Sequence, residues 1–139
     1  MKKDQAAHEI SPLMRELSDY IARACGKALP KPVVEKTKHH VLDTVAAMVS
    51  GSRLLPGKMA TAYVKTLGGT KEATVVGSRQ VTNAVNAALA NGMQAHADET
   101  DDSHARSLTH PGCGVVSAAL AMAERGHCGG TALLRAVAL

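Results

Sequence analysis

Residues 96–104 read His-Ala-Asp-Glu-Thr-Asp-Asp-Ser-His, and the motif Thr-His-Pro-Gly follows at 109–112. The nine residues hold four of the chain's twelve carboxylates, two imidazoles and two hydroxyls, with no Lys or Arg among them. On a surface helix, like charges four residues apart cost about 0.2–0.5 kcal/mol per pair, so acidic runs usually contain Lys or Arg. Asp98 and Asp102 have that spacing without a compensating cation. Because helical patterns flank the run on both sides, it predicts a functional site between two packed helices.

The composition indicates one globular domain built from helices. Of the 139 residues, 45% are apolar and 20% charged, which is typical of a folded chain rather than a disordered one. Tyr20 and Tyr63 are the only Tyr, Phe or Trp residues, so the core must consist of Ala, Val, Leu and Met. Such a core suits closely packed helices better than a β-sandwich. We therefore expect an all-α, multi-helix fold, with a flexible N-terminus over residues 1–10 and a helical domain over residues 11–139.

Caps, breakers and apolar spacing place the expected helices. A Ser-Pro pair begins the first helix, Gly26 ends it, and the second carries an apolar stripe of Val34, Val41, Leu42, Val45, Ala46 and Val49. Residues 73–76 are β-like but short, and we interpret them as an extended connector. The expected helices span 12–25, 33–50, 59–67, 83–95, 115–124 and 131–139. Because no cap or Gly ends the last helix at Leu139, we expect the chain to be part of a longer protein.

Charge and hydropathy exclude several classes of function. The net charge is +4, and the basic residues are spread from Lys2 to Arg135 without a dense run, which is not typical of nucleic-acid binding. No stretch reaches the roughly 18 apolar residues that span a bilayer. The three cysteines form no Cys-x-x-Cys pair, which favours reduced thiols and a cytoplasmic location.

The acidic segment and His110 suggest acid–base chemistry. If residues 96–104 continue the preceding helix, Glu99 and Ser103 share a face, and His110 returns near the same side. A carboxylate beside an imidazole is a simple acid–base pair, because the carboxylate orients the ring and imidazole exchanges its proton near neutral pH. Unpaired N–H groups at the start of the next helix, around Gly112, offer an anion site. Together these features suit a small carboxylic acid as substrate.

Three other interpretations remain open from the residues alone. His96 and His104 could ligate a divalent metal, although no standard metal-binding spacing is present. The acids could cap helix ends while the histidines lie buried and hydrogen-bonded. Cys113, which lies between two glycines at a helix start, could be a reactive thiol, although no base stands beside it in the sequence.

The sequence also resembles the N-terminal helical domain of the MmgE/PrpD family, which includes 2-methylcitrate dehydratase, cis-aconitate decarboxylase and related isomerases or epimerases. The resemblance covers nearly the whole chain from Ser11 onward. Its most specific parts are residues 96–104 and His110-Pro111-Gly112. The weaker matching segments are residues 29–36, 42–44, 50–53, 67–69, 72–75 and 90–92.

The resemblance implies a lyase or isomerase that acts on a small di- or tricarboxylic acid without a metal or organic cofactor. It further implies a homodimer of much longer chains, with a smaller α/β lid that completes the site, so this chain holds only part of it. A non-catalytic remnant or interaction domain is the alternative. The family motif is His-x-x-Asp-Phe-Asp-Asp-Thr-His, in which Glu99 here replaces the first Asp of Asp-Phe-Asp-Asp and Ser103 replaces the Thr.

By that matching, Glu99 and Ser103 would contact the substrate and His110 would act as acid or base. The residues expected to bind substrate or to orient these three are His96, Asp101, Asp102, His104 and Gly112.

Overall fold

The computed structural model describes residues 10–139, so residues 1–9 of the expected flexible N-terminus lie outside the described part. Over residues 10–139 the chain forms six helices and one two-stranded antiparallel sheet, which confirms the expected all-α class. No helix in this range is both long and apolar enough to cross a membrane. The elements are α1 (Pro12–Ala24), α2 (Lys31–Gly51), α3 (Leu55–Leu67), β1 (Ala73–Thr74), β2 (Val81–Thr82), α4 (Ala84–Ala95), α5 (Pro111–Arg125) and α6 (Gly130–Ala138).

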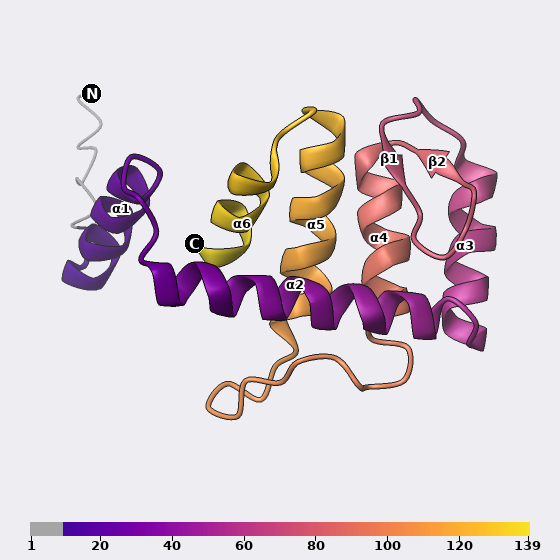
Figure 1. The fold of residues 1–139 in the computed structure, drawn as a ribbon, viewed down its shortest axis with the longest axis horizontal. Coiled ribbons are helices and arrows are strands. Elements are labelled where there is room, and N and C mark those ends of the chain that lie inside the picture. Colours follow the sequence, from indigo (N-terminus) through magenta and orange to yellow (C-terminus); the bar gives the residue numbers. More distant parts are fainter. Residues whose placement is uncertain (1–9) are drawn as a thin grey trace, which may run out of the picture.

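Helices α3 to α6 stand side by side in a row, and the long helix α2 crosses one face of that row (Figure 1). Helix α4 is central, because it packs against α5, α2 and α3. Helix α1 lies beyond the end of the row (Figure 1), where the Arg135 guanidinium of α6 donates to the carbonyl of Cys25. The hairpin of β1 and β2 precedes α4, and the acidic segment follows the C-terminal end of α4.

Local sequence explains where the helices begin. The Ser11 hydroxyl accepts a hydrogen bond from the Met14 N–H (3.2 Å), and Asn83 Oδ1 accepts one from the Asn86 N–H (2.8 Å), so both residues act as N-caps. Helices α3 and α5 begin earlier than expected, at Leu55 and Pro111, because each has a proline in its first turn, where a missing N–H costs nothing.

The buried side of α2 differs from the apolar stripe expected from the sequence. Leu42 and Val49 are 69% and 47% exposed, whereas Thr44 and Met48 are completely buried. Small side chains let α2 approach the row closely, and the Thr44 hydroxyl satisfies its hydrogen-bonding need by donating to the carbonyl of His40 (2.9 Å). The buried residues of α2 are Thr37, Thr44, Ala47, Met48 and Gly51.

The tightest packing is at the corner where α2, α3 and α4 meet. A Cβ on Gly51 would overlap the backbone carbonyl of Gln94, and a Cβ on Gly57 would overlap the carbonyl of Gly51. Gln94 itself is fully buried, and its amide donates to the Thr61 hydroxyl (3.0 Å). Two glycines therefore allow three helices to meet at backbone distance.

The expected extended connector at residues 73–76 is in fact half of a hairpin. Ala73 pairs with Thr82 and Thr74 with Val81. The fully buried Asn91 of α4 fixes this hairpin, because its Oδ1 accepts from the Val76 N–H (2.9 Å) and its Nδ2 donates to the Thr74 carbonyl (3.0 Å). A two-stranded hairpin of this length is marginally stable by itself. The buried amide of Asn91 supplies hydrogen bonds that further strands would otherwise have to provide.

Candidate functional site

The acidic segment is a loop, so the preceding helix ends at Ala95 as expected, and the helix face considered for Glu99 and Ser103 does not form. Helix α4 ends at Ala95, and His96 is its C-cap residue. Glu99 has a φ of 54°, in the left-handed region that an α-helix does not use. The chain then runs along α2 before it enters α5 (Figure 1). An antiparallel β-bridge between His104 and Thr109 joins the two sides of this loop. Glu99 and Ser103 are both exposed and do not share a helix face.

Asp98 explains why the helix stops. Its carboxylate accepts hydrogen bonds from the Thr100 hydroxyl (2.7 Å) and from the Ser50 hydroxyl of α2 (2.8 Å). Short polar side chains that bond nearby groups in this way compete with helical hydrogen bonding. The same two bonds, with that from Thr100 the stronger influence, hold the pKa of Asp98 below its ordinary value of 3.8.

The centre of the site is Asp101, whose side chain has no exposed surface. Its Oδ1 lies 3.2 Å from Nδ1 of His96 and 3.2 Å from Nδ1 of His110, so one oxygen faces two imidazoles. The two ring centroids are 4.8 Å apart. The contact with His96 is a hydrogen bond, whereas His110 Nδ1 is buried and has no hydrogen-bond partner. Asp101, expected only to orient other residues, is therefore the residue that connects them.

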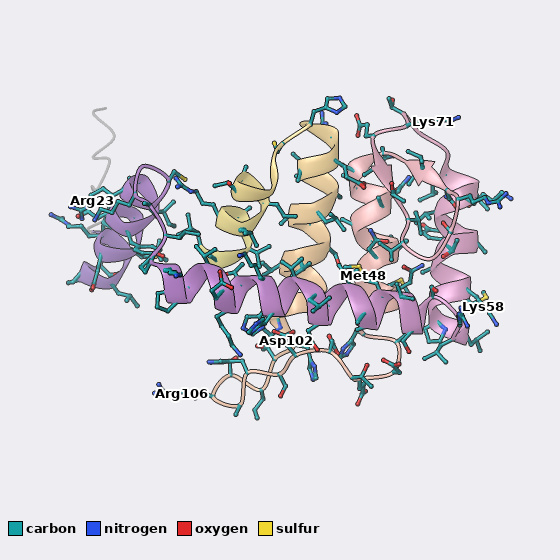
Figure 2. The ribbon with its side chains drawn as sticks, viewed as in Figure 1. Arg23, Met48, Lys58, Lys71, Asp102 and Arg106 are labelled. Carbon is teal, nitrogen blue, oxygen red and sulfur yellow. The ribbon has the colours of Figure 1, made fainter. Side chains whose placement is uncertain are left out.

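Asp102 fills the anion site expected at the start of α5. Its Oδ1 accepts from the Gly112 N–H (2.8 Å), and its Oδ2 lies 3.9 Å from Nδ1 of His40 on α2. Figure 2 shows Asp102 beside α2, while Arg106 lies at the far tip of the loop. A Cβ on Gly112 would overlap the Asp102 carboxylate and would lie 2.6 Å from the Thr44 hydroxyl. The N–H group of Gly112, which was expected to bind an anionic ligand, is thus already hydrogen-bonded to the Asp102 carboxylate.

A groove of about 390 Å³ adjoins this loop. Ser103, His104 and Gly112 line it, as expected for residues that meet a substrate, but Glu99 and His110 do not. Lys36 and His40 of α2 also line the groove, although neither was among the residues expected in a site. Their spacing of four residues on one helix was the available signal, because it places two groups that can carry positive charge on one face. The groove is completed by Val33, Thr37, Asp102, Pro111, Val115, Val116, Val137 and Ala138.

Cys113 has the wrong environment for a nucleophile. Its thiol donates to the carbonyl of His110 (3.0 Å), and burial together with the negative charge of Asp101 raises the pKa of that thiol above its ordinary value of 9.0. A raised pKa keeps the sulfur protonated and unreactive at neutral pH.

The alternative in which His96 and His104 ligate one metal gains no support, because His104 is not part of the one group of possible metal ligands found within residues 10–139. His104 bonds to the Ser107 hydroxyl (2.7 Å) on the exposed part of the loop, away from the cluster. Within residues 10–139 a different set of possible metal ligands does come together, namely His96, Asp101 and Cys113.

One comparison with known proteins agrees with the resemblance noted in the sequence. A family model described as the MmgE/PrpD N-terminal domain matches residues 15–139. Searches of curated proteins and of solved structures found no match.

Proposed function

The chain belongs to the MmgE/PrpD family, and from that premise we propose that it supplies part of the active site of a lyase or isomerase acting on a small di- or tricarboxylic acid. The proposed chemistry is acid–base catalysis without a metal or organic cofactor. The family resemblance further supports a homodimer of the full-length protein, and the absence of a Cys-x-x-Cys pair supports a cytoplasmic location.

The observation that carries the proposal is the buried Asp101 carboxylate between His96 and His110. A buried carboxylate orients an adjacent imidazole and stabilises it when it accepts a proton. In this proposal His110 removes or returns the proton on the carbon next to a substrate carboxylate, and Asp101 balances the charge that the ring gains. His96, whose ring is 46% exposed, holds Asp101 in place from the other side.

The groove supplies groups that suit an acidic substrate. Lys36 and His40 can offer positive charge to a carboxylate, and the Ser103 hydroxyl can donate a hydrogen bond to it. The volume of about 390 Å³ fits a small molecule, because ligand pockets usually run from about 300 to 1,000 Å³. Glu99 is exposed and does not line the groove, so its assignment to the substrate rests on the family motif alone.

Proton exchange tests the step assigned to His110. Protein expressed from the complete reading frame is incubated in D₂O with a panel of small hydroxy di- and tricarboxylic acids, and deuterium entering beside each carboxylate is followed by NMR. We expect exchange on at least one acid, slowed about 100-fold or more by His110→Ala, since general acid–base groups contribute about 10²–10⁴-fold.

Two further variants sharpen the test. Asp101→Asn keeps the shape of the side chain but removes the charge, and we expect exchange to slow by about tenfold or more. His39→Ala is the matched control, because His39 is an exposed histidine of α2 outside the site, and its exchange should equal that of the unmodified protein. Unchanged exchange in His110→Ala would refute the role of His110. Absence of exchange on every acid would favour a non-catalytic domain.

A further inference from the structure

Two adjoining cavities lie between α3 and the hairpin loop, and we propose that together they bind a small phosphate ester that carries free hydroxyl groups. The inner cavity has a volume of about 250 Å³ and the outer cavity about 560 Å³. Both are lined by Thr61, Lys65 and Ser78, so they form one continuous cleft, which we call the basic cleft. It shares no residue with the groove of the proposed reaction and does not depend on that reaction.

The basic cleft carries positive charge without a compensating carboxylate. Lys58 and Lys65 of α3 line it, together with Lys71 before β1 and Arg79 in the hairpin loop. Among the residues that the structure describes, no Asp or Glu lines either cavity, and none of these four cations takes part in an ion pair. Clefts lined by one sign of charge attract ligands of the opposite sign, and Arg and Lys are the usual partners of phosphate. The charge therefore favours a phosphate-bearing ligand.

A buried amide in the inner cavity provides an independent indication of a ligand. Gln94 of α4 is completely buried, yet it lines this cavity. Its Nε2 donates to the Thr61 hydroxyl (3.0 Å), and that hydroxyl donates in turn to the Gly57 carbonyl (2.9 Å), so the orientation of the amide is fixed. Within residues 10–139, Gln94 Oε1 is left without a hydrogen-bond partner. Because buried polar atoms almost always have a partner, this oxygen is placed to accept a hydrogen bond from a ligand hydroxyl.

The charge and the unpaired oxygen lie in different parts of the cleft, which defines the shape of the ligand. Gln94 lines only the inner cavity, whereas Lys71 and Arg79 line only the outer one. Figure 2 shows Lys58 and Lys71 near opposite ends of α3, so the cleft follows that helix. A single phosphate ion is too small to engage both parts. A sugar phosphate can place its phosphate among the cations of the outer cavity and a hydroxyl at Gln94 Oε1.

Titration of the 139-residue chain with three probes tests the proposal. The probes are glucose 6-phosphate, hexyl phosphate, which has the phosphate but no hydroxyl groups, and inorganic phosphate. Binding is followed by two-dimensional NMR, which also identifies the residues in contact with each probe. We expect saturable binding of glucose 6-phosphate that is at least about tenfold tighter than binding of the other two, because a site that hydrogen-bonds a hydroxyl rejects an analogue without one. The side-chain amide signals of Gln94 should shift with glucose 6-phosphate only.

Substitution of the cations tests their part in binding without disturbing the core, because their side chains are exposed. Lys65→Ala and Arg79→Ala should each weaken the binding of glucose 6-phosphate about threefold or more, since each removes one exposed charge. The double variant should weaken it about tenfold or more. Lys27→Ala is the matched control, because Lys27 is an exposed lysine that lines neither cavity, and its affinity should equal that of the unmodified chain.

Three outcomes would overturn the proposal. The first is the absence of saturable binding of glucose 6-phosphate. The second is equal affinity for hexyl phosphate or inorganic phosphate, which would show that the cleft attracts an adventitious ion only. The third is a loss of affinity in Lys27→Ala as large as that in Lys65→Ala. Failure of the proton-exchange experiment would leave these results unaffected, so the two proposals fail separately.

Discussion

Helix α4 joins two irregular segments, the hairpin of residues 68–83 at its start and the loop of residues 96–110 at its end, and the two are held in different ways. The hairpin pairs its own backbone, and the buried amide of Asn91 satisfies two more of its backbone groups. The loop has one β-bridge and is otherwise attached through Asp98, Asp101 and Asp102.

This difference shows where a ligand can be accommodated. In the hairpin, the hydrogen bonds to Asn91 are fully paired, because its amide donor and its amide acceptor each have one partner. In the loop, one oxygen of Asp101 faces two ring nitrogens, and one of those nitrogens is left unpaired. The loop therefore contains a buried ring nitrogen whose hydrogen-bonding capacity the fold does not use.

The largest expected effect tests whether the hairpin depends on one amide. Asn91→Ala removes both bonds and leaves the Val76 N–H and the Thr74 carbonyl without partners, at a cost of about 3 kcal/mol in the free energy of unfolding. Urea denaturation measures the loss. Val85→Ala is the control on the same helix, because Val85 is 77% exposed and its change should stay within about 0.5 kcal/mol. Equal losses in the two variants would contradict the role given to Asn91.

A smaller effect is expected at the junction of the loop with α5. In Gly112→Ala the new methyl group must displace the Asp102 carboxylate or the Thr44 hydroxyl, and we expect a loss of about 1–3 kcal/mol in the free energy of unfolding. Gly114→Ala is the matched control, since a Cβ there meets no atom within 4 Å, and it should stabilise the helix by up to about 1 kcal/mol. NMR shifts in Gly112→Ala should concentrate in residues 96–110 and leave the hairpin unchanged. Shifts centred on the hairpin would show that the two segments are not independent.

The smallest expected effect concerns acid and Asp98. Hydrogen bonds lower the pKa of Asp98 in the folded protein below its ordinary value of 3.8. The ionised carboxylate therefore stabilises the fold at any pH above 3.8, and this stabilisation is lost as the pH falls through the lower pKa of the folded protein. Asp98→Asn should therefore melt slightly below the unmodified chain at neutral pH and at the same temperature in strong acid. Melting temperatures measured across that range test this. Asp43→Asn is the control, as Asp43 is an exposed carboxylate of α2. If the melting temperature of Asp98→Asn stayed below that of the unmodified chain in strong acid, the effect would come from something other than the charge of Asp98.

Sequence patterns predicted the helices well, because caps and prolines act locally. The Ser11 cap of α1 follows from the identities of a few neighbouring residues. The proline-bearing first turns of α3 and α5 were missed, and each of these helices begins four residues before its expected start. The buried side of α2 was not predictable from apolar spacing, since its contacts use Thr44 and Gly51, which look polar or neutral in sequence. The hairpin escaped prediction for a similar reason, because Asn91 lies well beyond it in the chain.

For the site, the sequence located the segment but not its geometry. Ser103, His104 and Gly112 do line the groove, and His96, Asp101 and His110 do meet. Glu99 became central and Asp101 peripheral through the family motif and through a helix face considered for residues 96–104, which form a loop. The hydrogen bond from Ser50 that helps to stop the helix joins residues 48 positions apart, so no local pattern contains it.

The corner formed by Gly51, Gly57 and Gln94 has a consequence for how this sequence can evolve. Neither glycine can gain a methyl group without overlapping backbone, and backbone cannot move aside as a flexible side chain can. Apolar core positions can exchange among residues of similar volume, but these two glycines have no substitute that leaves the three helices in place. Two glycines six residues apart, followed by a buried glutamine on a later helix, should therefore mark distant homologues after the apolar positions have drifted.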